Sequence, residues 1–161
     1  ASIREGIVRY RFGAVAAALL LSACGAADPD EAADAVAIQD ASPVPGGEIA
    51  SLLSGRTVYA RYDIDSATLH AGDPWVEYYR PDGRYYYEDQ RRSFAGRWSA
   101  RDGKLCFSEK TATVCGDVYN VGSTVYFTQD GPGASHGTLV GSSTRIEQGD
   151  VEGLAGRAGG S

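Results

Sequence analysis

The sequence has few of the side chains on which common enzyme mechanisms depend. Its 161 residues include only two histidines, His70 and His136, and three cysteines. It also lacks the H-E-x-x-H motif of zinc enzymes and the Gly-Lys-Ser/Thr end of a phosphate-binding loop. Histidine is the usual acid and base near neutral pH, and Ser135, adjacent to His136, would point to the opposite face of a strand. We therefore expect no enzymatic activity, no cofactor and no metal site, with an enzyme of unrecognised type as an alternative.

Basic residues are also scarce. The chain has 15 lysines and arginines against 21 aspartates and glutamates, which gives a formal net charge of −6. Residues 1–23 hold three of the basic residues and one of the acidic residues, so the rest of the chain has 12 against 20 and a net charge of −8. Proteins that bind nucleic acids use lysine and arginine to neutralise phosphates. The charge therefore argues against a nucleic acid as a partner.

No apolar run is long enough to span a bilayer, which takes about 20 residues. The clearest run, residues 13–21, consists of nine Gly, Ala, Val and Leu residues and follows Arg4, Arg9 and Arg11. Basic residues before a short apolar stretch and small residues after it are typical of a secretory signal. A buried core helix is the alternative interpretation.

Residues 21–24, Leu-Ser-Ala-Cys, resemble the bacterial lipobox, in which a lipid is joined to the cysteine and the chain is cut just before it. The resemblance implies that residues 1–23 are a lipoprotein signal peptide and that acyl chains on Cys24 hold the mature protein on a membrane. Because Gly25 and not aspartate follows, the resemblance also implies passage to the outer membrane of the cell envelope. We expect the protein to face the periplasm, with exposure at the cell surface as the alternative.

The next segment, residues 24–47, contains no aromatic residue and is rich in alanine, aspartate and proline. This composition predicts a flexible tether. The sequence GGEIASLLSG, residues 46–55, predicts two helical turns closed by Gly55. We place a β domain at residues 48–155 and a flexible tail at residues 156–161.

From residue 56 onward, short runs rich in Val, Tyr, Phe, Trp and Thr alternate with turn residues such as Pro81-Asp82-Gly83 and Asp102-Gly103. This pattern is typical of successive antiparallel strands. A flat meander would leave two open edges. We therefore expect a single all-β domain whose meander closes into a small barrel or sandwich, lipocalin-like or calycin-like. The predicted strands are 56–63, 74–80, 84–90, 94–100, 104–109, 112–119, 123–128, 136–140 and 143–147.

With Cys24 lipidated, Cys106 and Cys115 form an even pair in an exported protein, which predicts a disulfide. A two-residue turn at 110–111 would place the two cysteines directly opposite each other on adjacent strands. They would form a non-hydrogen-bonded pair with Cα atoms about 4.5 Å apart, a separation that a disulfide tolerates. The alternatives are a zinc site and a reactive thiol, but the two cysteines have no histidine near them in the sequence to serve as a companion.

Aromatic residues are concentrated in WVEYYRPDGRYYYEDQ, residues 75–90, and arginines are frequent around this stretch. Aromatic and arginine side chains are enriched at binding surfaces. We therefore expect a contact surface for an envelope protein or another ligand, although cross-strand tyrosine pairs that only stabilise the sheet are the alternative. The candidate contact residues are Trp75, Tyr78, Tyr86, Arg91 and Arg92.

The stretches LLSGRTVYARY, EYYRPDGRYYY, FAGRWSARDGKLCF and TVCGDVYNVG resemble a family of small exported or lipid-anchored domains of alphaproteobacteria whose function is unknown. The resemblance covers about residues 50–155 and implies a β-rich fold. The stretch AGRWSARDGKLCFSEKTATVC is also similar to the Gly-x-Trp and cysteine core of bacterial barrel-type protease inhibitors. That resemblance implies an N-terminal segment that enters a protease cleft. We expect a non-enzymatic binding or structural module anchored in the envelope, with a periplasmic protease inhibitor as the alternative.

Overall fold

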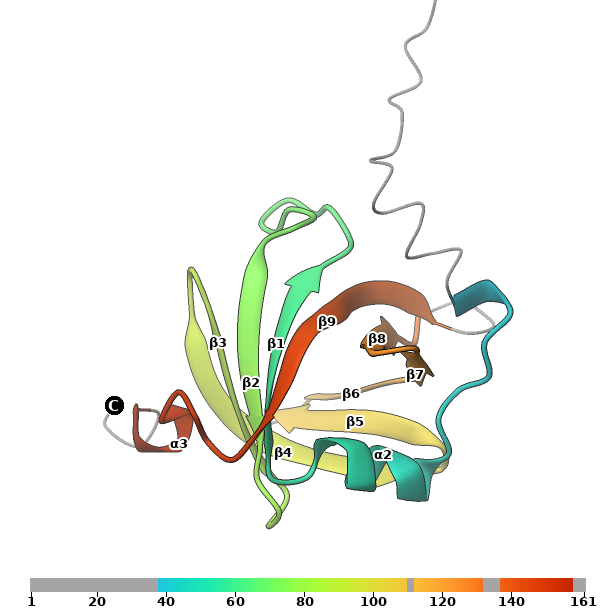
Figure 1. Ribbon diagram of the computed structural model, residues 1–161. Coiled ribbons are helices and arrows are strands. Elements are labelled where there is room, and N and C mark those ends of the chain that lie inside the picture. The colour runs from blue at the N-terminus through green and yellow to red at the C-terminus, as the bar shows by residue number, and fades with distance from the viewer. Residues whose placement is uncertain (1–37, 110–111, 132–136, 158–161) are drawn as a thin grey trace, which may run out of the picture.

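The structure is a computed structural model that describes residues 38–109, 112–131 and 137–157 (Figure 1). The predicted signal peptide at residues 1–23, the predicted lipidation site Cys24 and most of the predicted tether lie outside the described residues. The same holds for the last four residues of the predicted tail.

The described residues form one antiparallel sheet of nine strands in the order β6-β5-β4-β3-β2-β1-β9-β8-β7. Strands that follow one another in the chain pair with each other, except β6 and β7, and β1 pairs with β9 as well as with β2. The predicted meander is therefore confirmed. The strands are β1 Arg56–Tyr62, β2 Pro74–Tyr79, β3 Arg84–Asp89, β4 Ser93–Arg101, β5 Lys104–Glu109, β6 Ala112–Gly116, β7 Val118–Val121, β8 Thr124–Gln129 and β9 Thr138–Gln148.

The sheet is nearly closed into a barrel by contacts that we call the β6–β8 seam. The predicted strand 112–119 is broken at Asp117 into β6 and β7, which continue one another. Across this break the N–H of Thr128 donates to the carbonyl of Asp117 at 3.0 Å, and the N–H of Asp130 donates to the carbonyl of Cys115 at 2.8 Å. The two ends of the sheet therefore meet, which confirms the predicted all-β barrel.

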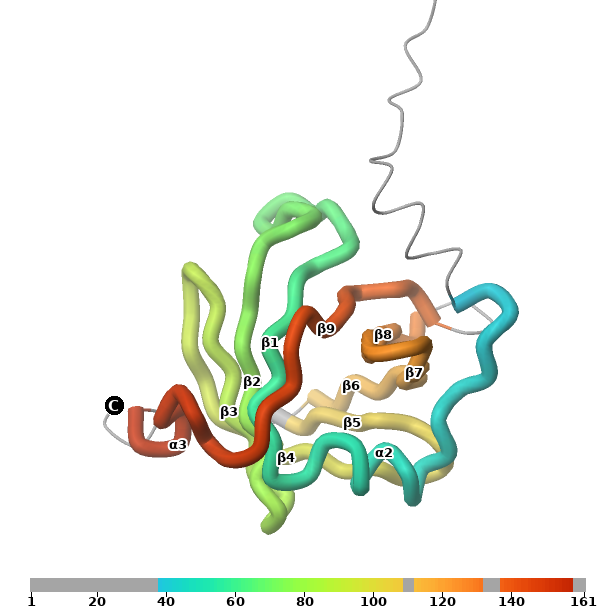
Figure 2. The backbone as a smooth tube through the Cα atoms, in the orientation of Figure 1, coloured from blue at the N-terminus to red at the C-terminus, as the bar shows by residue number. Residues whose placement is uncertain are grey.

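Strand β9 is a single strand of 11 residues and not the two that the sequence predicts. Its register shifts opposite Tyr59 and Ala60 in β1 and again opposite Phe127 and Thr128 in β8. Such bulges insert an unpaired residue and bend the strand. Figure 2 shows the resulting course of β9, which bends from its pairing with β1 over β8. The bend is what brings the end of the meander back toward its start.

Helix α2, Gly46–Leu53, lies across one end of the barrel beside β4 and β5 (Figure 1). Its Ile49 and Leu53 side chains are fully buried in the core. The helix ends where predicted, because Gly55 adopts a φ of +73°, a left-handed conformation that favours glycine. Just before the helix, the N–H of Val44 donates to the carbonyl of Val118 at 2.7 Å. The packed part of the chain therefore begins earlier than Glu48, where composition places the boundary.

The short helix α3, Leu154–Arg157, follows β9 and contacts β3 and β2 from outside the barrel (Figure 1). Its Leu154 side chain is buried. Within the described residues, no helix is both long enough and apolar enough to cross a bilayer.

Candidate functional site

The barrel encloses a cavity of about 120 Å³ that is lined by residues from β1, β2, β3, β5, β6, β8 and β9. An engineered protein cavity of about 150 Å³ holds a benzene molecule, so this one has room for a ligand of roughly one small ring. Its apolar lining consists of Tyr62, Trp75, Tyr79, Tyr87, Leu105, Phe107, Val114, Phe127 and Val140. Its polar lining includes Glu77, Asp117, Thr128 and Gln129.

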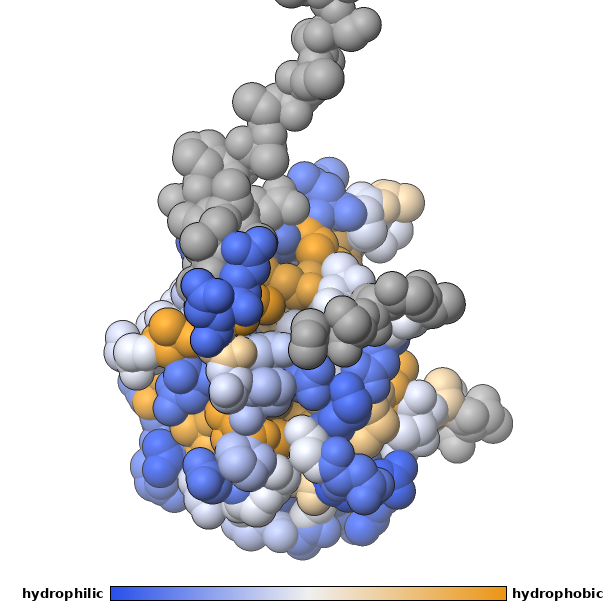
Figure 3. Space-filling view, turned by 90° about the vertical axis from the view of Figure 1, so that its right-hand side faces the viewer, coloured by the Kyte–Doolittle hydropathy of each residue, from blue (hydrophilic) through white to orange (hydrophobic). Residues whose placement is uncertain are grey.

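The cavity reaches the surface beside β6. Val114 pairs with Phe107 across the β5–β6 hairpin and lines the cavity, yet 40% of its surface is exposed. Figure 3 shows apolar residues between hydrophilic ones on the side of the molecule that faces right in Figure 1. An apolar side chain that lines a cavity and is also exposed marks a route of entry.

Glu77 is the acidic group at the centre of the cavity wall. Side chains of a strand alternate between two faces, so Trp75, Glu77 and Tyr79 on β2 all point into the barrel and all three are buried. Burial raises the pKa of Glu77 from its ordinary value of 4.5 to about 7, and this exceeds the lowering by the hydrogen bond that the Tyr79 hydroxyl donates to Glu77 Oε2 at 2.5 Å. A buried carboxyl group with this pKa is present in both protonation states near neutral pH.

Trp75 contributes a second polar group to the same wall. Its indole N–H also lowers the pKa of Glu77, but its geometry is outside that of a hydrogen bond, and Nε1 is buried without a hydrogen-bond partner among the described residues. Gly141 on β9 makes room for the ring, because a Cβ atom there would lie 2.1 Å from Cη2 of Trp75. The cavity thus presents one carboxyl and one unused N–H donor on an aromatic wall.

The barrel mouth near the β3–β4 turn carries a chain of hydrogen bonds. The hydroxyls of Tyr62 and Tyr87 bond to each other, and the Tyr87 hydroxyl donates to Asp89. Burial raises the pKa of Asp89, but hydrogen bonds from Tyr87 and from the N–H groups of Arg91 and Arg92 outweigh it, so the pKa is lowered. Asp89 is therefore a stable carboxylate, and it holds Arg92 Nε at 3.4 Å.

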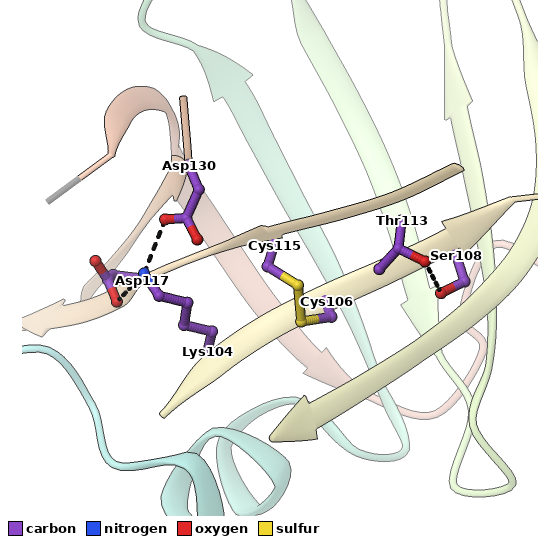
Figure 4. The surroundings of a disulfide bond; sticks show 7 residues. All are labelled: Lys104, Cys106, Ser108, Thr113, Cys115, Asp117 and Asp130. Atoms are coloured by element: carbon purple, nitrogen blue, oxygen red, sulfur yellow. Dashed lines mark hydrogen bonds and ion pairs between the residues drawn. A yellow bond between two sulfur atoms is a disulfide. The ribbon is translucent and has the colours of Figure 1, made fainter. Parts of the chain in front are cut away.

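A disulfide and an ion-pair cluster lie at and beside the β6–β8 seam (Figure 4). Cys106 and Cys115 are bonded, with Cα atoms 4.0 Å apart, and they face each other in the predicted register. This confirms the predicted pairing. Lys104 Nζ lies 3.1 Å from Asp117 Oδ1 and 2.8 Å from Asp130 Oδ1, so one ammonium group joins both sides of the seam.

The structure divides the predicted contact surface between two faces. Trp75 points into the barrel, and Tyr86 stacks on Tyr78 outside the barrel but is only 7% exposed. Both residues are buried, which corrects their assignment to an exposed surface. Arg91 and Arg92 are exposed at the mouth, and Tyr78 is half-buried on the outer face. The role of these three residues in binding stays a prediction.

Sequence reasoning missed Glu77 as a site residue. The alternation of β2 carried the signal, since an acidic residue lies two positions from Trp75 on one side and from Tyr79 on the other, hence on the same face. The assignment of Trp75 to the contact surface concealed it, because it placed Glu77 on an exposed face, and an acidic residue is unremarkable on a surface and unusual inside a barrel.

Comparisons with protein-family models, with curated proteins and with solved structures find no match to this chain. The two family resemblances in the sequence therefore stay predictions. Within the described residues, no group of three His, Cys, Asp or Glu side chains is placed to hold a metal ion. The fold and the cavity define the class of protein as a small antiparallel β-barrel with an internal cavity.

Proposed function

We propose that the protein is a non-enzymatic binding module of the bacterial envelope and that the inside of its barrel takes a small ligand. The observation that carries this proposal is the aromatic cavity with Glu77 and the unused Trp75 N–H on its wall. Ligand sites are typically apolar hollows with a few polar groups that fix the orientation of the ligand. The cavity has this composition.

The cost of these polar groups supports the same proposal. A buried polar group without a full set of partners destabilises a protein by about 1–3 kcal/mol. Glu77 could be replaced by an apolar residue, and the Trp75 ring by phenylalanine, without loss of the barrel's pattern of inward residues. Polar groups that cost stability inside a core are typical of a functional site.

The proposed location follows from the lipobox resemblance of residues 21–24. We propose that acyl chains on Cys24 anchor the barrel in the outer membrane, on the side that faces the periplasm. The intact mass of protein extracted from membranes should show the loss of residues 1–23 and the gain of acyl groups. The Cys24→Ser variant should no longer fractionate with membranes. An unmodified full-length chain in the membrane fraction would contradict this part of the proposal.

A ligand screen on the full chain tests the binding function. Small ligands of one-ring size should shift the NMR signal of the Trp75 indole N–H, while the signal of Trp98, whose indole donates to the Arg80 carbonyl at 2.9 Å, serves as an internal control. The Trp75→Phe variant assigns the two signals. Hits should compete with one another for the cavity.

A cavity-filling variant makes this test specific. Val114→Phe adds a ring to the cavity wall and should weaken binding of every hit by at least about tenfold. Val151→Phe is the matched control, because Val151 is exposed and does not line the cavity. If no ligand shifts the Trp75 signal, or if both variants bind equally well, the barrel interior is not a binding site.

A further inference from the structure

We propose that the ligand of the cavity is a small organic cation, an amine or quaternary ammonium compound of about one-ring size, whose charged group binds Glu77. This inference rests on the proposed binding function and adds the chemical class of the ligand. It is carried by the charges and rings that line the cavity.

The charges on the cavity wall are of one sign. Among the described residues that line the cavity, the charged ones are Glu77 and Asp117, which are both acidic, and none is a lysine, arginine or histidine. Asp117 already has an ion-pair partner outside the cavity in Lys104. Glu77 accepts a hydrogen bond from the neutral Tyr79 hydroxyl, and the nearby Trp75 N–H is neutral as well. An ionised Glu77 therefore lacks a counter-ion that a cationic ligand would supply.

The rings around Glu77 favour the same class of ligand. The faces of aromatic rings attract cations, and most strongly where water is excluded. In the described part of the chain, six such rings line the cavity, from Tyr62, Trp75, Tyr79, Tyr87, Phe107 and Phe127. A carboxylate inside an aromatic enclosure is a suitable environment for an ammonium group with a short apolar substituent.

Other classes of ligand fit this wall less well. A carboxylate or phosphate ligand would place a second negative charge beside Glu77 with no basic side chain on the described lining to offset it. A calcium or magnesium ion needs six or more oxygen ligands. The described residues bring no three acidic, histidine or cysteine side chains together. An organic cation needs only one carboxylate and the rings.

Three probes of nearly equal size and different charge test the inference: isobutylammonium, isobutanol and isobutyrate. Binding to the full chain is followed at pH 8 by the Trp75 indole signal. Isobutylammonium should bind at least about tenfold more tightly than isobutanol, because it adds the charge pair and the ring contacts. Isobutyrate should not bind.

Two variants locate the charge effect. Glu77→Gln keeps the shape of the side chain and removes its charge, so isobutylammonium and isobutanol should then bind equally. Glu48→Gln is the matched control, since Glu48 is exposed on α2 and does not line the cavity. It should keep the preference for the cation.

The pH dependence of the unaltered protein provides a second measurement that needs no variant. Because the pKa of Glu77 is about 7, the ionised fraction falls from half at pH 7 to about a tenth at pH 6. Affinity for isobutylammonium should therefore fall by about fivefold over this unit, while affinity for isobutanol should not fall.

Other ionisable groups that face the cavity do not supply this dependence. Tyr62 on β1, Tyr79 on β2 and Tyr87 on β3 all have a raised pKa and stay neutral, because burial disfavours their ionised forms. Asp117, at the break between β6 and β7, is held by Lys104. The mouth adds the carboxylate of Asp89, whose lowered pKa keeps it ionised, and its guanidinium partner Arg92.

The outcomes separate this inference from the proposed function. Equal binding of isobutanol and isobutylammonium, a preference that survives Glu77→Gln, or affinity for the cation that does not change between pH 7 and pH 6 would each overturn the inference. The same holds if ligands from the screen bind in the cavity and none of the three probes does. In all these cases the cavity can still be a binding site. If nothing binds in the cavity, both the inference and the proposed function fail.

Discussion

Two regions of the barrel are held together by different kinds of interaction. In the β2–β3 wall, formed by strands β2 and β3, inward aromatic rings pack on the rest of the core; the ring centres of Tyr79 and Trp98 lie 5.4 Å apart and those of Tyr85 and Phe107 lie 4.8 Å apart. The β6–β8 seam has two backbone hydrogen bonds across a broken strand, with the disulfide beside it and Lys104 bridging two aspartates. Regularly paired strands can be stabilised by the apolar area that their side chains bury. A break in a strand interrupts that packing, and here hydrogen bonds, a disulfide and ion pairs hold it together.

The largest effect should come from removing a ring of the β2–β3 wall. Tyr79 is fully buried, so Tyr79→Ala should lower the free energy of unfolding by about 3–5 kcal/mol. Tyr78→Ala is the matched control on the outer face of the same strand and should cost about 1 kcal/mol. Denaturant unfolding at pH 6 measures both. Equal losses would show that the inner rings are not what stabilises this wall.

Glu77 lies in the same wall, and its ionisation should lower the free energy of unfolding as the pH rises. Its pKa is raised in the folded protein to about 7, so its favourable contribution is complete below its ordinary pKa of 4.5 and is lost as the pH rises through 7. The loss should approach about 3 kcal/mol by pH 8. The Glu77→Gln variant should lack this loss and be more stable than the parent at pH 8, and Glu48→Gln should behave like the parent. Identical pH profiles for the parent and Glu77→Gln would contradict the prediction.

Opening the disulfide tests the covalent support of the seam. Replacement of both Cys106 and Cys115 by serine should lower the free energy of unfolding by about 2–3 kcal/mol, mainly because the unfolded chain regains freedom. Hydrogen exchange should rise first at the amides of Thr128 and Asp130, which donate across the seam, and later in the β2–β3 wall. A uniform rise over the whole barrel would mean that the two regions open together.

The smallest effect should come from the ion-pair cluster. Lys104 is partly exposed, and ion pairs at such positions contribute about 0–1 kcal/mol. Lys104→Met should therefore cost less than 1 kcal/mol, measured by denaturant unfolding, and the parent should lose the same amount in high salt. A loss as large as that of the cysteine variant would make the ion pairs, and not the disulfide, the main support of the seam.

Sequence reasoning succeeded where structure depends on neighbouring residues. Turn residues set the hairpins, and the spacing of Cys106 and Cys115 about their turn set the register of β5 on β6. It failed where distant segments meet. Alternation divides β2 into two faces but does not say which is inside, and nothing near Tyr86 in the sequence shows that α3 contacts the outside of β3. The break at Asp117 depends on its contact with β8, and its one local signal is Gly116, where a Cβ atom would lie 1.6 Å from the carbonyl oxygen of Thr128.

The β6–β8 seam also bears on self-association. Unpaired strand edges can add a strand from another chain, which is the first step toward aggregates. The described strands at the two ends of the sheet order present only short free edges, the first half of β6 and the strand β7, and the N–H of Val44 already donates to the carbonyl of Val118 at the start of β7. Neighbouring copies of the protein would therefore find little free backbone at these two ends with which to form a shared sheet. By bringing the ends of the meander together, the seam protects this aromatic, strand-rich chain against fibril formation.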